Sequence, residues 1–255
     1  MTTDVWQWQT WDGLDYLRCE LLQNWPHGFF TRQFAPRSPQ ELAASFSETA
    51  SVHRVRQVHG RRVLPSTRAT QIEPYADADG LVTVAAQQAV WVCSADCTPV
   101  LIGDLRTGQA SAVHAGWRGT AQGIVPEAIR QLQDQGSRLE DLRVALGPAI
   151  AGSVYQVDVS VAVQVGQSLH PGKSPEALLE ALHGLSDPPL LPDETPGKVR
   201  LDVRRVNELQ LQELGLQPEQ VAVAPHCTFQ EPEVFFSYRR TGEKQVQWSG
   251  IVSRG

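Results

Sequence analysis

The segments CSADCTPV (residues 93–100) and AVHAGWRG (residues 112–119) place a thiol, an imidazole and glycine at the ends of short apolar runs. Turn-forming Gly, Asp and Thr residues bound these runs, which span 89–93, 99–102 and 109–114. Short β-branched runs between turn residues are typical of strands, and the last two predict a hairpin. The segments therefore indicate a β-sheet whose strand ends carry chemically active side chains.

Helices and strands are predicted on both sides of this hairpin in the sequence. Asp12-Gly13, after a Trp-rich stretch, predicts an opening hairpin, and Ser38-Pro39 with Glu41 has the spacing of a helix N-cap before a short helix ending near Ala50. Further helices are predicted at 124–132, 159–169, 175–183 and 203–214, and strands at 52–58, 81–84, 143–146, 221–223, 234–236 and 245–251. The Pro-rich stretch 188–197 is expected to be a surface loop. The mixture predicts one α/β domain over residues 1–255, built as an α/β sandwich on a mixed sheet.

Composition excludes several classes of protein. The net charge of −6 comes from interspersed acids and bases, without the basic stripe that follows a nucleic-acid backbone, so nucleic acid is not an expected partner. The sequence has no apolar run of membrane-spanning length and starts without a signal-like segment, so we expect a cytoplasmic protein that does not enter a membrane. Four cysteines in 255 residues are too few for a disulfide framework. They are expected to be free thiols or metal ligands.

One thiol and two imidazoles are candidates for a shared metal ion. His59 in QVHG (57–60), Cys97 and His114 all lie at the ends of predicted strands. Catalytic zinc sites use three protein ligands of this kind and leave a fourth position open. A copper site with two histidines and one cysteine usually adds an axial methionine, and the only methionine is Met1. Zinc is therefore the favoured metal, with copper as a possible substitute.

Neighbouring polar residues complete the candidate site. Asp96 precedes Cys97 and is a candidate general base or hydrogen-bond partner of the site, whereas Asp77 and Asp79 before Gly80 are interpreted as turn formers. Guanidinium groups fit phosphate with a fork of donors, so the expected anion-binding residues are Arg118, Arg239 and Arg240. Cys227 is interpreted as a small buried residue.

Nine segments resemble the YfiH family, also called the laccase-domain or polyphenol-oxidoreductase-like family and, in bacteria, the peptidoglycan editing factor family. They are HGFFTR (27–32), QVHG (57–60), DADGLVT (77–83), SADCTPVLIGD (94–104), AVHAGWRGT (112–120), LGPAI (146–150), LDVRRVNELQLQELG (201–215), CTF (227–229) and FFSYRR (235–240). These segments follow the family's order over nearly the whole chain.

The resemblance implies a monomeric α/β sandwich related to cysteine-hydrolase-like toxin domains, with zinc held by His59, Cys97 and His114. It implies an enzyme that uses phosphate to cleave adenosine, inosine and methylthioadenosine, and that also deaminates adenosine. Water activated by zinc suits the displacement of ammonia at purine C6. Purine nucleosides and phosphate are thus the expected partners. On the matched motifs, Arg32 and Gln57 join the residues expected to bind substrate or phosphate.

Alternatives stay open at this point. The chain carries Gln156 where the family usually has Glu, lacks a common Cys near Ser153-Val154, and replaces a glycine-rich loop with residues 33–39. Hydrolytic editing of peptidoglycan precursors, with Cys97 as nucleophile, is the first alternative. Copper-dependent phenol oxidation is the second, and a metal-stabilised binding module without activity is the third.

Overall fold

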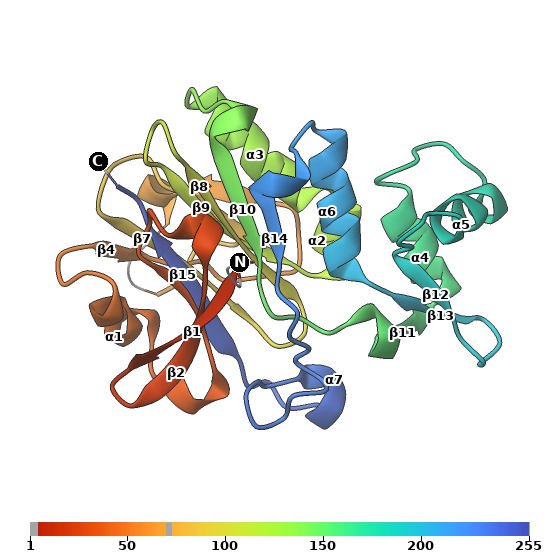
Figure 1. Cartoon of the computed structure of the whole chain (residues 1–255), viewed down its shortest axis with the longest axis horizontal. Coiled ribbons are helices and arrows are strands. Elements are labelled where there is room, and N and C mark those ends of the chain that lie inside the picture. The colour runs from red at the N-terminus through yellow and green to blue at the C-terminus, as the bar shows by residue number, and fades with distance from the viewer. Residues whose placement is uncertain (1–4, 70–72, 255) are drawn as a thin grey trace.

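The computed structural model describes residues 5–69 and 73–254, which form two large mixed sheets, flanking helices and a smaller lobe (Figure 1). The first sheet has the order β1-β2-β3-β15-β7-β4. Its strands are β1 (Trp6–Trp11), β2 (Leu14–Cys19), β3 (His27–Phe30), β15 (Gln247–Val252), β7 (Gln88–Ser94) and β4 (Ser51–His53).

The second sheet has the order β14-β10-β8-β9-β6-β5. Its strands are β14 (Val221–Val223), β10 (Leu142–Leu146), β8 (Thr98–Asp104), β9 (Ala110–Ala115), β6 (Gly80–Val82) and β5 (Val63–Pro65). Chain direction is antiparallel at the β8–β9 hairpin and parallel between β10 and β14. In the first sheet, β4 and β7 are parallel, whereas the other neighbouring strands are antiparallel. Both large sheets are therefore mixed.

The lobe is a three-stranded sheet with two helices, and Figure 1 shows it beside the two large sheets. It consists of β11 (Gln156–Asp158), β13 (Lys198–Leu201), β12 (Leu190–Pro192), α4 (Val159–Gly166) and α5 (Pro175–His183). The other helices are α1 (Pro39–Leu42), α2 (Trp117–Ala121), α3 (Ile124–Asp134), α6 (Val203–Glu213) and α7 (Tyr238–Thr241). Within the described residues, none of these helices has the length and apolar character needed to span a bilayer.

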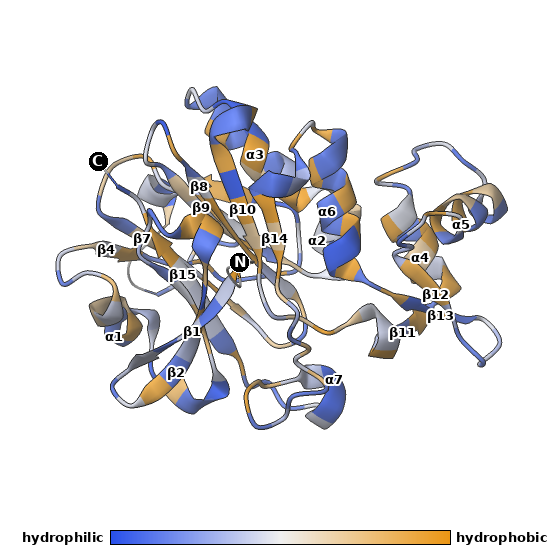
Figure 2. Ribbon diagram, viewed as in Figure 1, coloured by the Kyte–Doolittle hydropathy of each residue, from blue (hydrophilic) through white to orange (hydrophobic). Residues whose placement is uncertain are grey.

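Four apolar clusters fix the layers. One fills the space between the large sheets, where Val90 and Ile251 of the first sheet pack in the same cluster as Leu101 and Ala112 of the second. A second cluster joins the other face of the second sheet to α3 and to the end of α6. Figure 2 shows the hydrophilic outer sides of these two helices. An aromatic cluster around Trp91 covers the outer face of the first sheet, and the lobe has a cluster of its own. The predicted α/β sandwich is thus confirmed.

Several local predictions are also confirmed. The opening hairpin turns at Asp12 and Gly13, which have φ angles of 52° and 74°. Ser38 caps α1 in the predicted capping box with Glu41. The helix at 124 continues to Asp134 and is followed by Gly136 at φ 98°. The strand 221–223 and the helix 175–183 are found with the predicted ends. Strands 81–84, 89–93, 99–102, 109–114, 143–146 and 245–251 and helices 159–169 and 203–214 are found with shifted ends.

Three local predictions are wrong. The helix after Ser38 ends at Leu42 and passes into a single 3₁₀ turn, well before Ala50. The strand predicted at 52–58 ends at His53, because the following loop bends to hydrogen-bond with Asp79. Residues 234–236 are a loop in which Phe235 and Phe236 are buried, and the main-chain N–H groups of Val234 and Phe235 donate to the Glu231 carbonyl. The stretch 188–197 is only in part a loop, since it contains β12.

Candidate metal centre

Three distant segments bring His59, Cys97 and His114 together. One donor atom from each residue lies within 4.8 Å of the others, and the two imidazole rings meet edge to face with centroids 4.8 Å apart. His59 lies in the loop between β4 and β5, Cys97 in the turn between β7 and β8, and His114 near the end of β9. His114 is buried, Cys97 is half-buried and His59 is exposed. The set is therefore anchored on one side and open on the other, as a site with a free coordination position requires.

The β8–β9 hairpin sets the spacing between Cys97 and His114. Its register pairs Pro99 with His114 and Thr98 with Ala115, so the turn holding Cys97 lies beside Gly116. A methyl group at Gly116 would lie 2.9 Å from Cys97 Sγ and 3.3 Å from His59 Cδ2. Because glycine has no side chain, the sulfur and the ring of His59 can share that space. The close approach explains why this strand ends in Ala-Gly.

Asp79 is the residue that connects the two candidate histidine ligands. Its fully buried carboxylate accepts hydrogen bonds from the main-chain N–H groups of Val58 (3.2 Å), His59 (2.8 Å) and Gly60 (2.7 Å). The same carboxylate lies 3.0 Å from Nδ1 of His114. The interpretation of Asp79 as a simple turn former is wrong, because one carboxylate holds the His59 loop and orients the His114 ring. Asp77, in contrast, forms an exposed ion pair with Arg56.

The charges of these groups depend on one another. Burial would raise the pKa of the Cys97 thiol, but the nearby His114 and His59 rings lower it to about 6. Burial would lower the pKa of His114, but the Cys97 sulfur and the Asp79 carboxylate raise it to about 9. The pKa of Asp79 is below its usual value, because hydrogen bonds from His114 and the main chain outweigh the effect of burial. The pocket thus favours a thiolate, the form of cysteine that binds metals.

These residues fit a bound zinc ion. The donor set is two nitrogens and one thiolate sulfur, and a carboxylate orients one of the imidazoles from behind, as is common for metal-binding histidines. Within residues 5–69 and 73–254, no other group of three His, Cys, Asp or Glu side chains is close enough to hold an ion. The described chain therefore has one candidate metal centre.

Asp96 has a strained backbone and a fully engaged carboxylate. Its φ angle is 90°, which is rare for a residue other than glycine. One carboxylate oxygen accepts from the Thr228 hydroxyl and the other from the main-chain N–H of Arg239, each at 2.7 Å. Its main-chain carbonyl accepts from Ile150. Asp96 therefore ties the turn that carries Cys97 to the segments around Thr228 and α7.

The metal centre lies in a cavity of about 520 Å³. Trp117, Tyr155 and Tyr238 give it aromatic walls, and Arg118, Arg239 and Lys244 give it positive charge. The Arg118 guanidinium lies 4.4 Å from the ring centre of Trp117, and that of Arg239 lies 4.7 Å from the ring centre of Tyr155. Flat aromatic faces beside cations suit a planar ligand with an anionic group. Tyr238 belongs to the aromatic and basic segment FFSYRR, whereas nothing in the local sequence pattern distinguishes Tyr155 or Lys244 as cavity residues.

The other predicted binding residues have different positions. Gln57 lines the cavity, but its amide pairs with the main-chain N–H and C=O of Cys93. Arg32 donates to the Pro232 carbonyl, and Arg240 donates to main-chain carbonyls between residues 228 and 235. Neither of these two arginines lines the cavity. Of the predicted arginines, Arg118 and Arg239 are therefore the two that the structure brings to the metal centre.

The remaining thiols are free. Cys227 is buried and its sulfur accepts from the Ala151 N–H at 3.2 Å, in agreement with its interpretation as a small buried residue. Cys19 lies in the core between the sheets. Cys93 lines the cavity without belonging to the ligand group.

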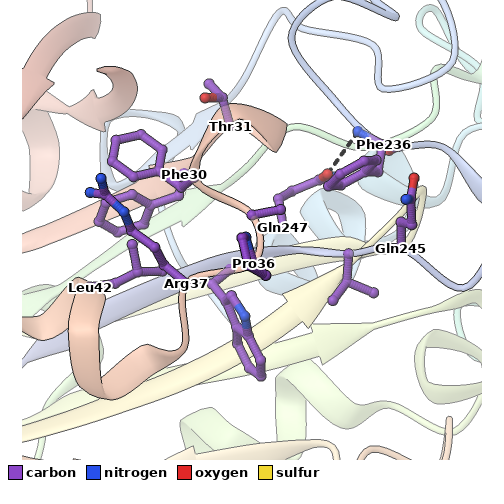
Figure 3. Close-up of a pocket in the computed structure, with 12 residues that line it drawn as sticks. Phe30, Thr31, Pro36, Arg37, Leu42, Phe236, Gln245 and Gln247 are labelled. Carbon is purple, nitrogen blue, oxygen red and sulfur yellow. Dashed lines mark hydrogen bonds between the residues drawn. The ribbon is translucent and has the colours of Figure 1, made fainter. Parts of the chain in front are cut away.

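A second cavity, of about 270 Å³, lies next to the first (Figure 3). Its walls are mainly apolar and include Phe30, Phe236 and Trp248. Gln247 lies beside it, and its amide oxygen accepts from the main-chain N–H of Phe236, as Figure 3 shows. The two cavities share Gln245 and Val246 in their walls. No group of metal ligands lines this second cavity among the described residues.

Comparisons with known proteins agree with this architecture. Residues 37–253 match the family model described as multi-copper polyphenol oxidoreductase laccase. A protein named purine nucleoside phosphorylase from Synechocystis is 54% identical over 261 residues, covering 99% of each chain. The purine nucleoside phosphorylase YlmD of Geobacillus stearothermophilus is 36% identical over 193 residues, which cover 72% of this chain and 65% of the relative.

Two solved structures are similar over almost the whole chain. The crystal structure of YlmD from Geobacillus stearothermophilus aligns with a TM-score of 0.81 and 26% identity, covering 99% of this chain and all of that one. The crystal structure of YfiH from Bacillus licheniformis aligns with a TM-score of 0.77 and 23% identity, covering 97% of this chain and 99% of the other. The fold described above is therefore the fold of these proteins.

Proposed function

This chain belongs to the multi-copper polyphenol oxidoreductase laccase family, and from that membership we propose that it is a purine nucleoside phosphorylase with one zinc ion held by His59, Cys97 and His114. The observation that carries the proposal is the meeting of these three donors at one cavity with aromatic walls and two arginines. The proposed substrates are adenosine, inosine and methylthioadenosine, together with phosphate. The proposed products are the free base and ribose 1-phosphate, and adenosine deamination is proposed as a second activity.

The cavity residues account for substrate binding. A purine base fits against the ring of Tyr238, which lines the cavity and is 55% exposed. Phosphate fits the guanidinium groups of Arg118 and Arg239, which stack on two other aromatic rings of the cavity and are held in place by them. The Nη1 of Arg239 also donates to the Gln156 carbonyl at 2.7 Å, so its position is fixed before a ligand arrives. Preorganisation of this kind lowers the cost of bringing two substrates together.

In phosphorolysis, a phosphate oxygen forms a bond to the ribose anomeric carbon while the bond from that carbon to the purine nitrogen breaks. The arginines neutralise the phosphate and hold it beside the sugar. In deamination, the oxygen of water bonds to purine C6 and the amino group leaves as ammonia. When bound, zinc supplies Lewis acidity and generates a nucleophile from water near neutral pH. Asp79 keeps the two histidine ligands in place throughout either reaction.

Zinc is preferred over copper for two reasons. The described ligand group has three donors and forms a single centre, whereas oxidases with several copper ions need more than one group of ligands. A copper site with two histidines and one cysteine usually adds an axial methionine, and the sequence has a single methionine at its first position. All four cysteines are free thiols, which is typical of proteins in a reducing compartment. The cytoplasm is therefore the proposed place of action.

The test pairs metal analysis with product identification. Purified protein is incubated with adenosine, with and without phosphate, and the products are separated by chromatography. We expect adenine only when phosphate is present and inosine in both cases, together with about one zinc per chain. Cys97→Ala should lose the zinc and both products. Cys93→Ala, which removes another thiol of the same cavity, should retain the zinc.

Further substrates separate the alternatives. Oxygen uptake with a phenol by copper-loaded protein would identify a phenol oxidase. Turnover of a muropeptide precursor, and not of any nucleoside, would identify a hydrolase that edits peptidoglycan precursors. If zinc removal lowers the melting temperature while none of these substrates reacts, the protein is a metal-stabilised binding module. Each of these outcomes contradicts the phosphorylase proposal.

A further inference from the structure

Tyr155 lies where the chain passes from the second large sheet into the lobe, between the 3₁₀ turn Gly152–Val154 and β11 (Figure 1). Its main-chain N–H donates to the carbonyls of Ala151 (3.1 Å) and Gly152 (3.3 Å), and its carbonyl accepts from the N–H of Leu201 (3.0 Å). The half-buried ring packs against the apolar cluster of the lobe and lines the cavity of the metal centre. The fold therefore holds this side chain firmly at the boundary between the lobe and the metal centre.

The hydroxyl of Tyr155 has no hydrogen-bond partner within the described part of the chain. The charges that act on this hydroxyl belong to four residues that also line the cavity, which are Cys97, Arg239, Asp96 and Arg118. The O–H group of a largely buried tyrosine usually has a partner. This hydroxyl therefore lies among the charged groups of the cavity, where a ligand can supply the missing partner.

The hydroxyl keeps its proton near neutral pH. Burial, followed by the negative charges of Cys97 and Asp96, raises the pKa of Tyr155 to about 12, although Arg239 and Arg118 act in the opposite direction. A neutral phenol is a hydrogen-bond donor and brings no negative charge that would repel an anion. The hydroxyl is thus suited to bind an oxyanion together with cationic side chains.

Two arginines with free charge share the cavity with this hydroxyl. Among the residues that the structure describes, the guanidinium groups of Arg118 and Arg239 form no ion pair with a carboxylate. Arg239 lies over the ring of Tyr155, with 4.7 Å between the guanidinium carbon and the ring centre. Its Nη1 donates to the carbonyl of the next residue, Gln156, at 2.7 Å. Arg239 and the Tyr155 hydroxyl are therefore held together by the same segment.

We propose that the Tyr155 hydroxyl donates a hydrogen bond to phosphate in this cavity, as the third phosphate-binding group beside the guanidinium groups of Arg118 and Arg239. An anion with four oxygens accepts from all three groups at once, and the two cations balance the charge of a phosphate dianion. The inference rests on the proposed function for the identity of the anion. It adds a binding residue that comes from the edge of the lobe, so the lobe supplies part of the phosphate site.

Calorimetric titration of inorganic phosphate into the zinc-loaded full-length protein, with no nucleoside present, tests the hydrogen bond. Tyr155→Phe keeps the ring beneath Arg239 but removes the hydroxyl, so it should weaken phosphate binding by about tenfold. Tyr75→Phe is the matched control, because Tyr75 also lies under an arginine, with Arg54 4.1 Å from its ring centre, but does not line the cavity. The control should bind phosphate like the wild type. Equal phosphate affinity of Tyr155→Phe and the wild type, or no binding by either, would overturn the proposal.

The kinetics of adenosine phosphorolysis separate this inference from the proposed function. The KM of Tyr155→Phe for phosphate should rise by about tenfold, and saturating phosphate should restore kcat to within about twofold of the wild type, because the missing contact is to phosphate. A loss of kcat that persists at saturating phosphate would show that Tyr155 acts on folding or on the chemical step, which contradicts the inference. If the wild type forms no adenine when phosphate is present, the proposed function fails, and the calorimetric comparison still decides whether Tyr155 binds phosphate.

Discussion

Asp79 Oδ1 lies 3.0 Å from His114 Nδ1, and the two side chains are 0% and 3% exposed. Because the carboxylate engages Nδ1, the other ring nitrogen, Nε2, is the one available to a metal ion. The same carboxylate accepts the main-chain N–H of His59 at 2.8 Å. One buried charge therefore positions two candidate metal ligands that come from different parts of the chain.

Replacing Asp79 should weaken metal binding without removing a ligand. Asp79→Asn keeps the size of the side chain but loses its charge and half of its acceptors, so the His59 loop and the His114 ring are held less firmly. We expect zinc affinity to fall by about 10–100-fold, as for other partners of metal-bound histidines. Competition with a chromophoric chelator measures it. Asp77→Asn, which removes an exposed carboxylate of the same loop, should bind zinc like the wild type. Equal affinities in the two variants would show that Asp79 acts only on folding.

Gly116→Ala should act on the site through the position of the sulfur. The φ angle of Gly116 is −73°, so alanine is tolerated by the backbone, but its methyl group would lie 2.9 Å from Cys97 Sγ. Displacing the sulfur should lower zinc affinity by about tenfold. Gly60→Ala is the matched control, because a methyl group there would lie at an ordinary 3.6 Å from Asp79 Oδ2. Isothermal titration of the metal-free proteins gives both affinities. An unchanged affinity for Gly116→Ala would mean that the sulfur has room to move.

The three candidate ligands could be singled out from sequence because His59 and His114 each follow an apolar run close to a glycine and Cys97 lies in a turn between two apolar runs, although His59 lies in a loop and not at a strand end. QVHG and AVHAGWRG display that pattern locally, and the turn of CSADCTPV separates two apolar runs. Asp79 could not be assigned in the same way. Its role depends on the loop at Val58 to Gly60 folding over it, and DADG has the composition of an ordinary turn.

The arginines show a similar limit of prediction from sequence. FFSYRR indicates an aromatic and basic segment, but it does not tell which guanidinium reaches the cavity. Arg239 does, whereas Arg240 binds the carbonyls of the loop that precedes it. The same loop contains residues 234–236, for which a strand was wrongly predicted. Its phenylalanines are buried because they are apolar, and an apolar run does not by itself distinguish a strand from a well-packed loop.

Gln156→Glu should destabilise the lobe. The Gln156 amide donates to Asp193 Oδ1 at 2.9 Å, and the Asp193 side chain is 4% exposed. A second carboxylate would lose this hydrogen bond and repel Asp193, so we expect a loss of about 1–2 kcal/mol in the free energy of unfolding. Urea denaturation at pH 7 measures it. In a double-mutant cycle, Asp193→Asn should remove most of the loss, and strict additivity would contradict the repulsion.

His27 should make the protein less stable as the pH falls. Its Nδ1 lies 2.8 Å from the Trp25 carbonyl and its Nε2 accepts from the Cys19 N–H, an arrangement that only the neutral ring can satisfy. Burial lowers its pKa from 6.5 to about 4. Unfolding therefore takes up a proton between these two pH values, so the stability that His27 contributes is complete above pH 6.5 and is lost as the pH falls toward about 4.

We expect the free energy of unfolding to fall by about 2 kcal/mol between pH 7 and pH 5. His27→Gln should flatten this dependence in urea denaturation, and His170→Gln, at a half-buried position, should leave it as in the wild type. A His27→Gln profile as steep as that of the wild type would assign the acid sensitivity to other groups.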